Sequence, residues 1–392
     1  MGRPLLGIES IATPPYGKLL NGKKTGLLAH PASTTSSFRH ALDVVLSTGA
    51  RVEILFGPEH GFGGEAQDME PVAGAQRGPR GIPLISLYGA DFASLVPSDD
   101  ALASLDVLVV DLFDVGARYY TFVWTALHCL RACARLGVEV LVADRPNPLG
   151  GDVVEGAPLP EDHFSFVGMA PLTNRHGLTL GEILTFSAKA EGLENALTVI
   201  PLEGWDRSDL FPETGLPWVM PSPNMPTFDT ALVYPGACLM EGTWASEGRG
   251  TTRPFELIGA PGIEGRSLVE ILENMNLPGV VFRPATFKPG FQKHAGQICS
   301  GVQYHVVDQE RFLPYRTGVA MLLALKVVAQ DAFCWRTQPY EFVSEKPAID
   351  LLAGSAEIRR GVDAEAPLED LADTWKAGEE TFRDARRELL IY

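Results

Sequence analysis

Titratable side chains follow several apolar, β-rich runs in the first half of the sequence, at the point where each run ends. These side chains are His30, Glu59, His60, Asp111, Asp114 and Asp144. Carboxylates and histidines are the groups that enzymes use most often for general acid–base catalysis. A single carboxylate after a strand is ordinarily a helix cap or a turn residue, so the hypothesis of a catalytic site requires these residues to converge.

Glu59 has the best-defined local setting of these residues. It lies in the GPEHG turn at 57–61, where a proline stiffens the backbone and two glycines permit tight geometry. Phe56 and Phe62 flank this turn, and an apolar wall raises the pKa of a carboxyl, which suits a general acid near neutral pH. We therefore predict Glu59 as a catalytic acid, while His60 fits a direct role and a packed, structural role equally well.

Two further segments carry polar side chains suited to a sugar. Residues 111–121 combine two acids, an arginine and two tyrosines, and hydroxylated rings suit the apolar faces and polar edges of a sugar. Residues 220–252 hold Asn, Thr, Ser, Glu and Arg between prolines and glycines, as binding loops do, although an ordered domain interface would look the same. Arg118 could equally form a structural ion pair with Asp114.

The predicted site comprises two groups of residues. The catalytic candidates are Glu59, Glu241 and Asp114, with Glu247 as an alternative second carboxylate. The predicted substrate-binding residues are His30, His60, Arg118, Tyr119, Tyr120, Asp144, Asn147, Asn224, Thr243, Glu247, Arg249 and Thr251. Arginine offers two parallel donors to a carboxylate, so Arg249 suits an anionic substrate group.

A parallel sheet is the element that would bring these residues together. Continuous apolar runs, typical of strands covered on both faces, occur at 25–30, 52–56, 83–87, 106–112 and 138–143. Apolar residues between 122 and 136 recur at helical spacing and predict a crossover helix. Ligands bind at the carboxyl ends of such strands, where the titratable residues lie. The pattern predicts the α/β class: a Rossmann-like, doubly wound parallel sheet in a domain spanning 1–230, and a smaller α+β domain at 231–392 that closes the cleft.

The amino-acid composition argues against several kinds of binding partner and location. The 392 residues carry a net charge of −17 without a basic run, which argues against nucleic acid and anionic membranes. No window reaches the ~18 apolar residues of a membrane span. Residues 1–9 lack a secretory signal, which predicts a cytoplasmic protein unless a signal was removed and the protein is exported. An odd, sparse set of 5 cysteines does not predict a disulfide framework.

Five motifs in order resemble the exo-β-N-acetylmuramidase (NamZ-like) family of bacterial glycoside hydrolases. They are GPEHGF, DVGARYYT, DRPNP, MPSPNMPT and EGTWASEGRGTTRPFE, and the similarity extends to IDLLAGSAEIRRGV near the C-terminus. The resemblance implies a Rossmann-like domain, a smaller C-terminal domain, an active site between them, and release of N-acetylmuramic acid from the non-reducing end of peptidoglycan fragments. The family's motif glutamate corresponds to Glu59. Muramic acid carries a lactyl carboxylate, for which Arg118 and Arg249 are the candidates.

Other hypotheses stay open at this stage. A metal-dependent hydrolase could use His30, Glu59, His60, Asp111 and Asp144, although their spacing matches no metal motif, and neither a metal nor a cofactor is expected. A non-catalytic protein that binds amino sugars or muropeptides could have the same two lobes. No GxGxxG follows the first strand, which argues against a dinucleotide oxidoreductase. The sequence leaves open whether the reaction proceeds with retention or inversion and which group is the second catalytic one, because the substrate's own 2-acetamido group could also serve as nucleophile. The oligomeric state is also left open.

Overall fold

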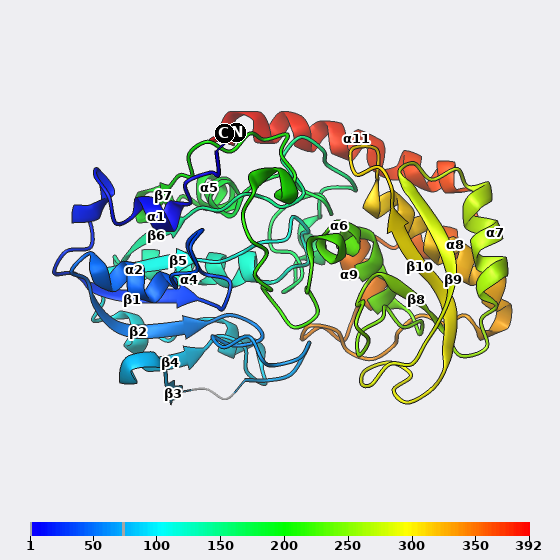
Figure 1. Cartoon of the computed structure of the whole chain (residues 1–392), viewed down its shortest axis with the longest axis horizontal. Helices are drawn as coiled ribbons and strands as arrows, with labels where there is room; N and C mark the ends of the chain where they lie inside the picture. The colour runs from blue at the N-terminus through cyan, green and yellow to red at the C-terminus, as the bar shows by residue number, and fades with distance from the viewer. Residues whose placement is uncertain (1, 73–74) are drawn as a thin grey trace.

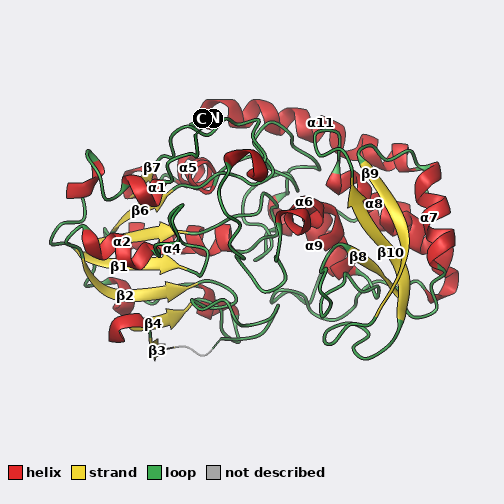
Figure 2. Cartoon of the chain, in the orientation of Figure 1, coloured by secondary structure: helices red, strands yellow, loops and turns green. Residues whose placement is uncertain are grey.

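A seven-stranded sheet forms the centre of the N-terminal half (Figures 1 and 2). The computed structural model describes residues 2–72 and 75–392. The strand order is β3 (Ala75–Arg77), β4 (Pro83–Ser86), β2 (Arg51–Gly57), β1 (Lys24–Ala29), β5 (Val107–Asp111), β6 (Glu139–Ala143) and β7 (Leu197–Ile200). Every pairing is parallel except that of β3 with β4. The expected α/β class with a doubly wound parallel sheet is confirmed.

Helices cover both faces of this sheet because alternate strand residues point to opposite sides. They are α1 (Gly7–Ser10), α2 (Ala41–Ser47), α3 (Asp99–Leu102), α4 (Phe122–Leu136) and α5 (Leu180–Glu191). Val107 and Val109 pack in one buried cluster with α1 and α2, whereas Leu108 and Val110 pack in the other with α4 and α5. This alternation is the physical basis of the doubly wound arrangement.

The C-terminal half is α+β, as expected. Its antiparallel sheet has the order β8 (Leu257–Ala260), β10 (Cys299–Val306), β9 (Val280–Phe287). Its helices are α6 (Phe228–Ala237), α7 (Gly265–Asn274), α8 (Pro314–Ala329), α9 (Ala348–Ala353), α10 (Glu357–Asp363) and α11 (Leu368–Arg386). Helix α6 runs across the predicted boundary at 230/231, and its side chains share one buried cluster with Val110 and Leu322 from the two halves. The boundary itself stays a prediction.

Short 3-10 helices complete the chain. They are η1 (Tyr16–Lys18), η2 (Pro79–Gly81), η3 (Phe92–Leu95), η4 (Glu161–His163), η5 (Glu194–Ala196), η6 (Phe211–Thr214), η7 (Cys238–Gly242), η8 (Gln330–Ala332) and η9 (Arg387–Leu389). Within the described ranges, no helix has the length and apolar character needed to span a bilayer.

The C-terminal segment joins the two halves. Helix α11, red in Figure 1, extends along one side of the molecule, and the chain then ends beside the N-terminal half. The Tyr392 hydroxyl donates to Asp144 Oδ2 at 2.7 Å, and the Ile391 amide donates to Glu182 Oε1 at 2.8 Å. The tail therefore packs at the end of β6, where Asp144 lies.

Two glycines allow α6 and α8 to cross at close range. A Cβ at Gly318 would lie 2.3 Å from the Gly236 carbonyl oxygen, and a Cβ at Gly236 would lie 1.8 Å from the Pro314 carbonyl oxygen. Neither backbone can shift without moving a helix, so both positions require glycine.

We expect Gly318→Ala to lower the free energy of unfolding, measured by urea denaturation, by about 1–3 kcal/mol because the methyl group overpacks the crossing. Alanine's better helix propensity, about 1 kcal/mol, acts in the opposite direction and is too small to compensate. Gly290→Ala is the control, since its nearest neighbour would be 3.4 Å away. A Gly318→Ala protein as stable as the wild type would contradict this account of the crossing.

Candidate active site

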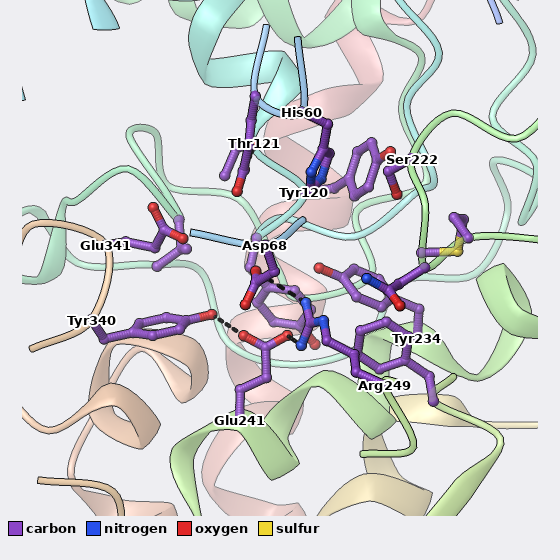
Figure 3. Close-up of a pocket in the computed structure, with 16 residues that line it drawn as sticks. His60, Asp68, Tyr120, Thr121, Ser222, Tyr234, Glu241, Arg249, Tyr340 and Glu341 are labelled. Carbon is purple, nitrogen blue, oxygen red and sulfur yellow. Dashed lines mark hydrogen bonds and ion pairs between the residues drawn. The ribbon is translucent and has the colours of Figure 1, made fainter. Parts of the chain in front are cut away.

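A small pocket lies where loops of the two halves meet, shown in Figure 3. Its lining comprises Glu59, His60, Asp68, Tyr119, Tyr120, Thr121, Val167, Ser222, Asn224, Met225, Tyr234, Glu241, Arg249, Phe255, Tyr340 and Glu341. The free volume is only about 30 Å³, which accommodates water-sized groups. The pocket in this structure is therefore closed around its polar side chains.

Glu59 enters the pocket from the turn that follows β2. Its side chain is 4 % exposed, and the Thr121 hydroxyl donates a hydrogen bond to Oε2 at 2.5 Å. The next residue, His60, has a φ of 68°, which allows the chain to reverse direction directly after Glu59. Nδ1 of His60 donates to the Ala66 carbonyl at 2.9 Å, so a neutral ring keeps Nε2 as an acceptor.

Three carboxylates crowd together on one side of the pocket. Glu59, Asp68 and Glu341 each place an oxygen within 4.8 Å of the other two. Burial raises the pKa of Glu341 well above its ordinary value, and repulsion from Glu59 and Asp68 adds to the effect. Burial likewise raises the pKa of Asp68, against the attraction of Arg249. Asp68 and Glu341 consequently retain protons at pH values where exposed carboxyls are ionised.

The same three oxygens could bind a hard cation such as Mg²⁺ or Ca²⁺. Of the metal ligands considered from the sequence, Glu59 belongs to this group and His60 lines the same pocket, whereas Asp111 and Asp144 have other partners. Asp111 is paired with Arg145, and Asp144 accepts hydrogen bonds from Thr179 and Tyr392.

Arg249 neutralises the other side of the pocket. Its guanidinium lies 3.1 Å from Asp68, 2.6 Å from Glu241 and 3.1 Å from Glu247. Burial alone would raise the pKa of Glu247, but Lys293 and Arg249 hold it at about 2. The three carboxylates come from both halves of the chain, so this cation binds the two walls together.

Both carboxylate oxygens of Glu241 accept hydrogen bonds. Oε1 accepts from Arg249, and Oε2 accepts a 2.6 Å hydrogen bond from the Tyr340 hydroxyl (Figure 3). Burial raises its pKa in spite of Arg249. Tyr340 and Glu341 belong to a short turn closed by the Tyr340–Val343 bridge, in which Glu341 and Phe342 have φ values of 44° and 68°. Two successive non-glycine residues in the left-handed region make this a strained turn.

Two comparisons with known proteins identify the family. A model described as the N-terminal part of exo-beta-N-acetylmuramidase NamZ matches residues 25–229, and its C-terminal counterpart matches residues 232–392. The chain is also 38 % identical over 387 residues to the peptidoglycan beta-N-acetylmuramidase NamZ of Bacillus subtilis, covering 98 % of this chain and 91 % of that protein. The chain belongs to the exo-β-N-acetylmuramidase NamZ family.

Solved structures agree with the fold of this NamZ-family chain. A DUF1343 family protein from Bacteroides fragilis aligns over 100 % of both chains with a TM-score of 0.87 and 29 % identity. A second DUF1343 family protein from the same organism aligns over 99 % of both chains with a TM-score of 0.74 and 25 % identity.

The NamZ-family pocket contains part of the predicted site. Its lining includes Glu59, His60, Tyr119, Tyr120, Asn224, Glu241 and Arg249. The predicted residues outside that lining are His30, Asp114, Arg118, Asp144, Asn147, Thr243, Glu247 and Thr251. The roles expected of the second group stay predictions, and their contacts in the structure are to other protein groups.

Several of those contacts stabilise loops after the strands. Asp144 accepts from Thr179 Oγ1 at 2.6 Å and from the Gly181 amide at 2.9 Å, at the N-terminus of α5. Asn147 donates to the Leu178 carbonyl at 2.9 Å. These are the cap and turn contacts that any carboxylate or amide after a strand can make.

Asp114, His30 and Thr251 are also engaged near the loops they occupy. Asp114 accepts from the Gly116 amide at 2.8 Å and lies 3.3 Å from His176 Nε2 rather than pairing with Arg118. His30 is fully buried, and its Nε2 accepts from the Phe113 amide at 3.0 Å. Thr251 Oγ1 donates to the Gly248 carbonyl at 2.6 Å.

Arg118 is a structural cation in this fold. It is 1 % exposed and donates to the carbonyls of Leu172 at 3.1 Å and Leu352 at 2.6 Å. Its guanidinium therefore joins α9 of the C-terminal half to a loop of the N-terminal half. Arg118 and Arg249 both have protein partners in this structure, and their expected binding of a lactyl carboxylate stays a prediction.

Sequence reasoning missed several lining residues. Thr121, Ser222 and Tyr234 lie within the segments 111–121 and 220–252, which the sequence predicts as binding segments. A prediction that included every polar residue of these segments would have contained them. Asp68, Tyr340 and Glu341 occur in irregular loops, and no periodicity or strand end marks them. Only their position in three dimensions reveals them.

We expect Arg249→Gln to reduce the free energy of unfolding at pH 7 by about 3–5 kcal/mol, because buried carboxylates lose their partner. The deficit should shrink at pH 5, since the unpaired carboxyls have raised pKa values and the folded variant takes up protons. Urea denaturation at both pH values measures this.

Arg135→Gln is the control for this variant. Arg135 makes an exposed ion pair with Asp99, so its loss should cost less than about 1 kcal/mol. Equal effects of the two substitutions would show that Arg249 is not the electrostatic centre of the pocket.

Proposed function

We propose that this chain is a glycosidase that releases N-acetylmuramic acid from the non-reducing end of peptidoglycan fragments, with a role in cell-wall turnover. Membership of the NamZ family and the named activity of the 38 % identical Bacillus subtilis relative support it. The observation that carries the proposal is the cluster of Glu59, Asp68 and Glu341 in a closed, aromatic-walled pocket between the two halves. Carboxyl groups in pairs, with at least one protonated, are what glycoside hydrolysis requires.

Glu59 is proposed as the general acid that protonates the leaving oxygen. Oε2 of Glu59 accepts a hydrogen bond from the Thr121 hydroxyl, which fixes the orientation of the carboxyl group. A general acid delivers its proton in the step that breaks the bond, and Glu59 is placed for this step in the pocket beside Asp68 and Glu341.

Asp68 and Glu341 are proposed as the candidates for the second carboxyl. Their oxygens lie within 4.8 Å of Glu59. Retaining glycosidases separate their carboxyls by about 5 Å, whereas inverting ones need roughly 6.5–9.5 Å to admit a water. The spacing in this closed pocket favours retention, with a carboxylate or the substrate's acetamido group attacking the anomeric carbon. Glu241 is less suited, because Arg249 and Tyr340 occupy both of its oxygens.

We expect Glu59→Gln to lower kcat for N-acetylmuramyl-N-acetylglucosamine by about 10²–10⁴-fold, the contribution of a general acid. Loss on a nitrophenyl β-N-acetylmuraminide should be much smaller, because nitrophenolate leaves without protonation. Sugar and chromophore release measure the two rates, and the exposed Glu65→Gln is the control.

The outcomes separate the alternatives for Glu59. Equal losses on both substrates would reject the acid role and favour a nucleophilic one. A wild-type protein that binds the sugar without releasing it would be a binding protein, and the hydrolase proposal would fail.

We expect Glu341→Gln to move the alkaline limb of the kcat/KM pH profile to lower pH, by about one unit. Loss of the last proton leaves two charged carboxylates in the variant and three in the wild type. Because the repulsion is weaker in the variant, the acid that carries this proton has a lower pKa. Glu345→Gln, an exposed neighbour hydrogen-bonded to Ser344, should leave the limb in place. A shift to higher pH in Glu341→Gln would contradict the shared-proton account.

A further inference from the structure

A second cavity of about 490 Å³ lies beside the catalytic pocket, and its lining differs sharply in charge. The lining includes Trp244, Trp335, Lys293, Arg336 and Gln338, together with threonine, cysteine and a second glutamine. Among the described residues that line it there is no carboxylate, although the chain carries a net charge of −17. We call this cavity the tryptophan groove.

The tryptophan groove adjoins the catalytic pocket through Arg336. The Arg336 guanidinium carbon lies 5.1 Å from the centre of the Tyr340 ring, which lines the pocket. Nη2 of Arg336 lies 3.5 Å from Met69 Sδ, next to Asp68 in the chain. A substrate that extends out of the pocket on this side therefore meets the guanidinium.

Arg336 is the available cation of the groove. In the described ranges it lies within ion-pair distance of no carboxylate, and its hydrogen bonds go to the Pro339 carbonyl at 3.0 Å and to Met69. Lys293 is already engaged by Glu247 at 2.9 Å and by two backbone carbonyls. A guanidinium without a carboxylate partner is suited to bind one from a ligand.

The aromatic walls of the groove are held in place. Trp244 and Trp335 both pack edge-to-face on Phe333, with ring centres 5.2 Å and 4.9 Å apart. The Trp335 indole donates to Asp363 Oδ1 at 2.8 Å, which fixes this ring further. Both tryptophans remain partly exposed, and rigid, exposed indole faces are typical surfaces for stacking a sugar ring.

We propose that the tryptophan groove binds the leaving-group side of the substrate, with Arg336 pairing the lactyl carboxylate of a second muramic acid residue. Stacking surfaces select a sugar, and the unpaired guanidinium selects an acidic one. The inference rests on the proposed glycosidase function and assigns its specificity for fragments longer than a disaccharide.

The test compares kcat/KM for two fragments that share the same cleaved bond. They are the disaccharide muramyl-glucosamine and the trisaccharide muramyl-glucosaminyl-muramic acid, both N-acetylated. We expect the wild type to prefer the trisaccharide about tenfold, and Arg336→Gln to bring this ratio close to one. Converting the carboxylate of the terminal, reducing-end sugar to an amide should remove the preference in the wild type and leave the variant unaffected.

Variants of the exposed Gln338 keep the test independent of the packing of Arg336. Gln338→Glu should lower the ratio and Gln338→Lys should raise it at low salt, with both effects diminishing at high ionic strength. A ratio unchanged in Arg336→Gln, or equal losses on both fragments, overturns the groove assignment. A wild type that hydrolyses neither fragment overturns the glycosidase function and this inference with it.

Discussion

The charge of Arg249 is the constraint on which the pocket depends. Asp68 belongs to a loop of the N-terminal half, whereas Glu241 and Glu247 belong to the C-terminal half, and all three meet the same guanidinium. Without that cation, carboxylates drawn from both halves would repel one another across a buried interface. The arrangement holds the walls together, and Asp68 connects Arg249 to Glu59 and Glu341, which have no cation within ion-pair distance among the described residues.

Much of the fold and part of the site could be predicted from the sequence. Continuous apolar strands, a helical stripe after Thr121 and polar residues at the carboxyl ends of strands are local patterns, and they led correctly to the parallel sheet and to Glu59 in the pocket. The same rule placed Asp144 at the sheet edge, but it could not distinguish a helix-capping carboxylate from one that faces the pocket. That distinction depends on where the following helix begins.

The residues that escaped prediction share a physical reason. Asp68 and Glu341 are separated by most of the chain and lie in loops whose conformation depends on partners from the other half. Arg118 shows the same limit, because the sequence places an arginine beside two tyrosines but does not reveal the backbone carbonyls to which it donates. Whether a buried charged side chain stabilises the fold or binds a ligand depends on the groups that surround it. Only the tertiary structure determines those groups.

The strained turn at Glu341 and Phe342 has a consequence for turnover. A pocket with about 30 Å³ of free volume has to widen before a pyranose ring enters, and the turn that carries Tyr340 and Glu341 forms one of its walls. Two left-handed residues cost of order 1–3 kcal/mol each, so a change of conformation in this turn would release that cost. If the pocket widens in this way, its affinity for the sugar depends on the fraction of molecules that are open, and product release requires the same opening.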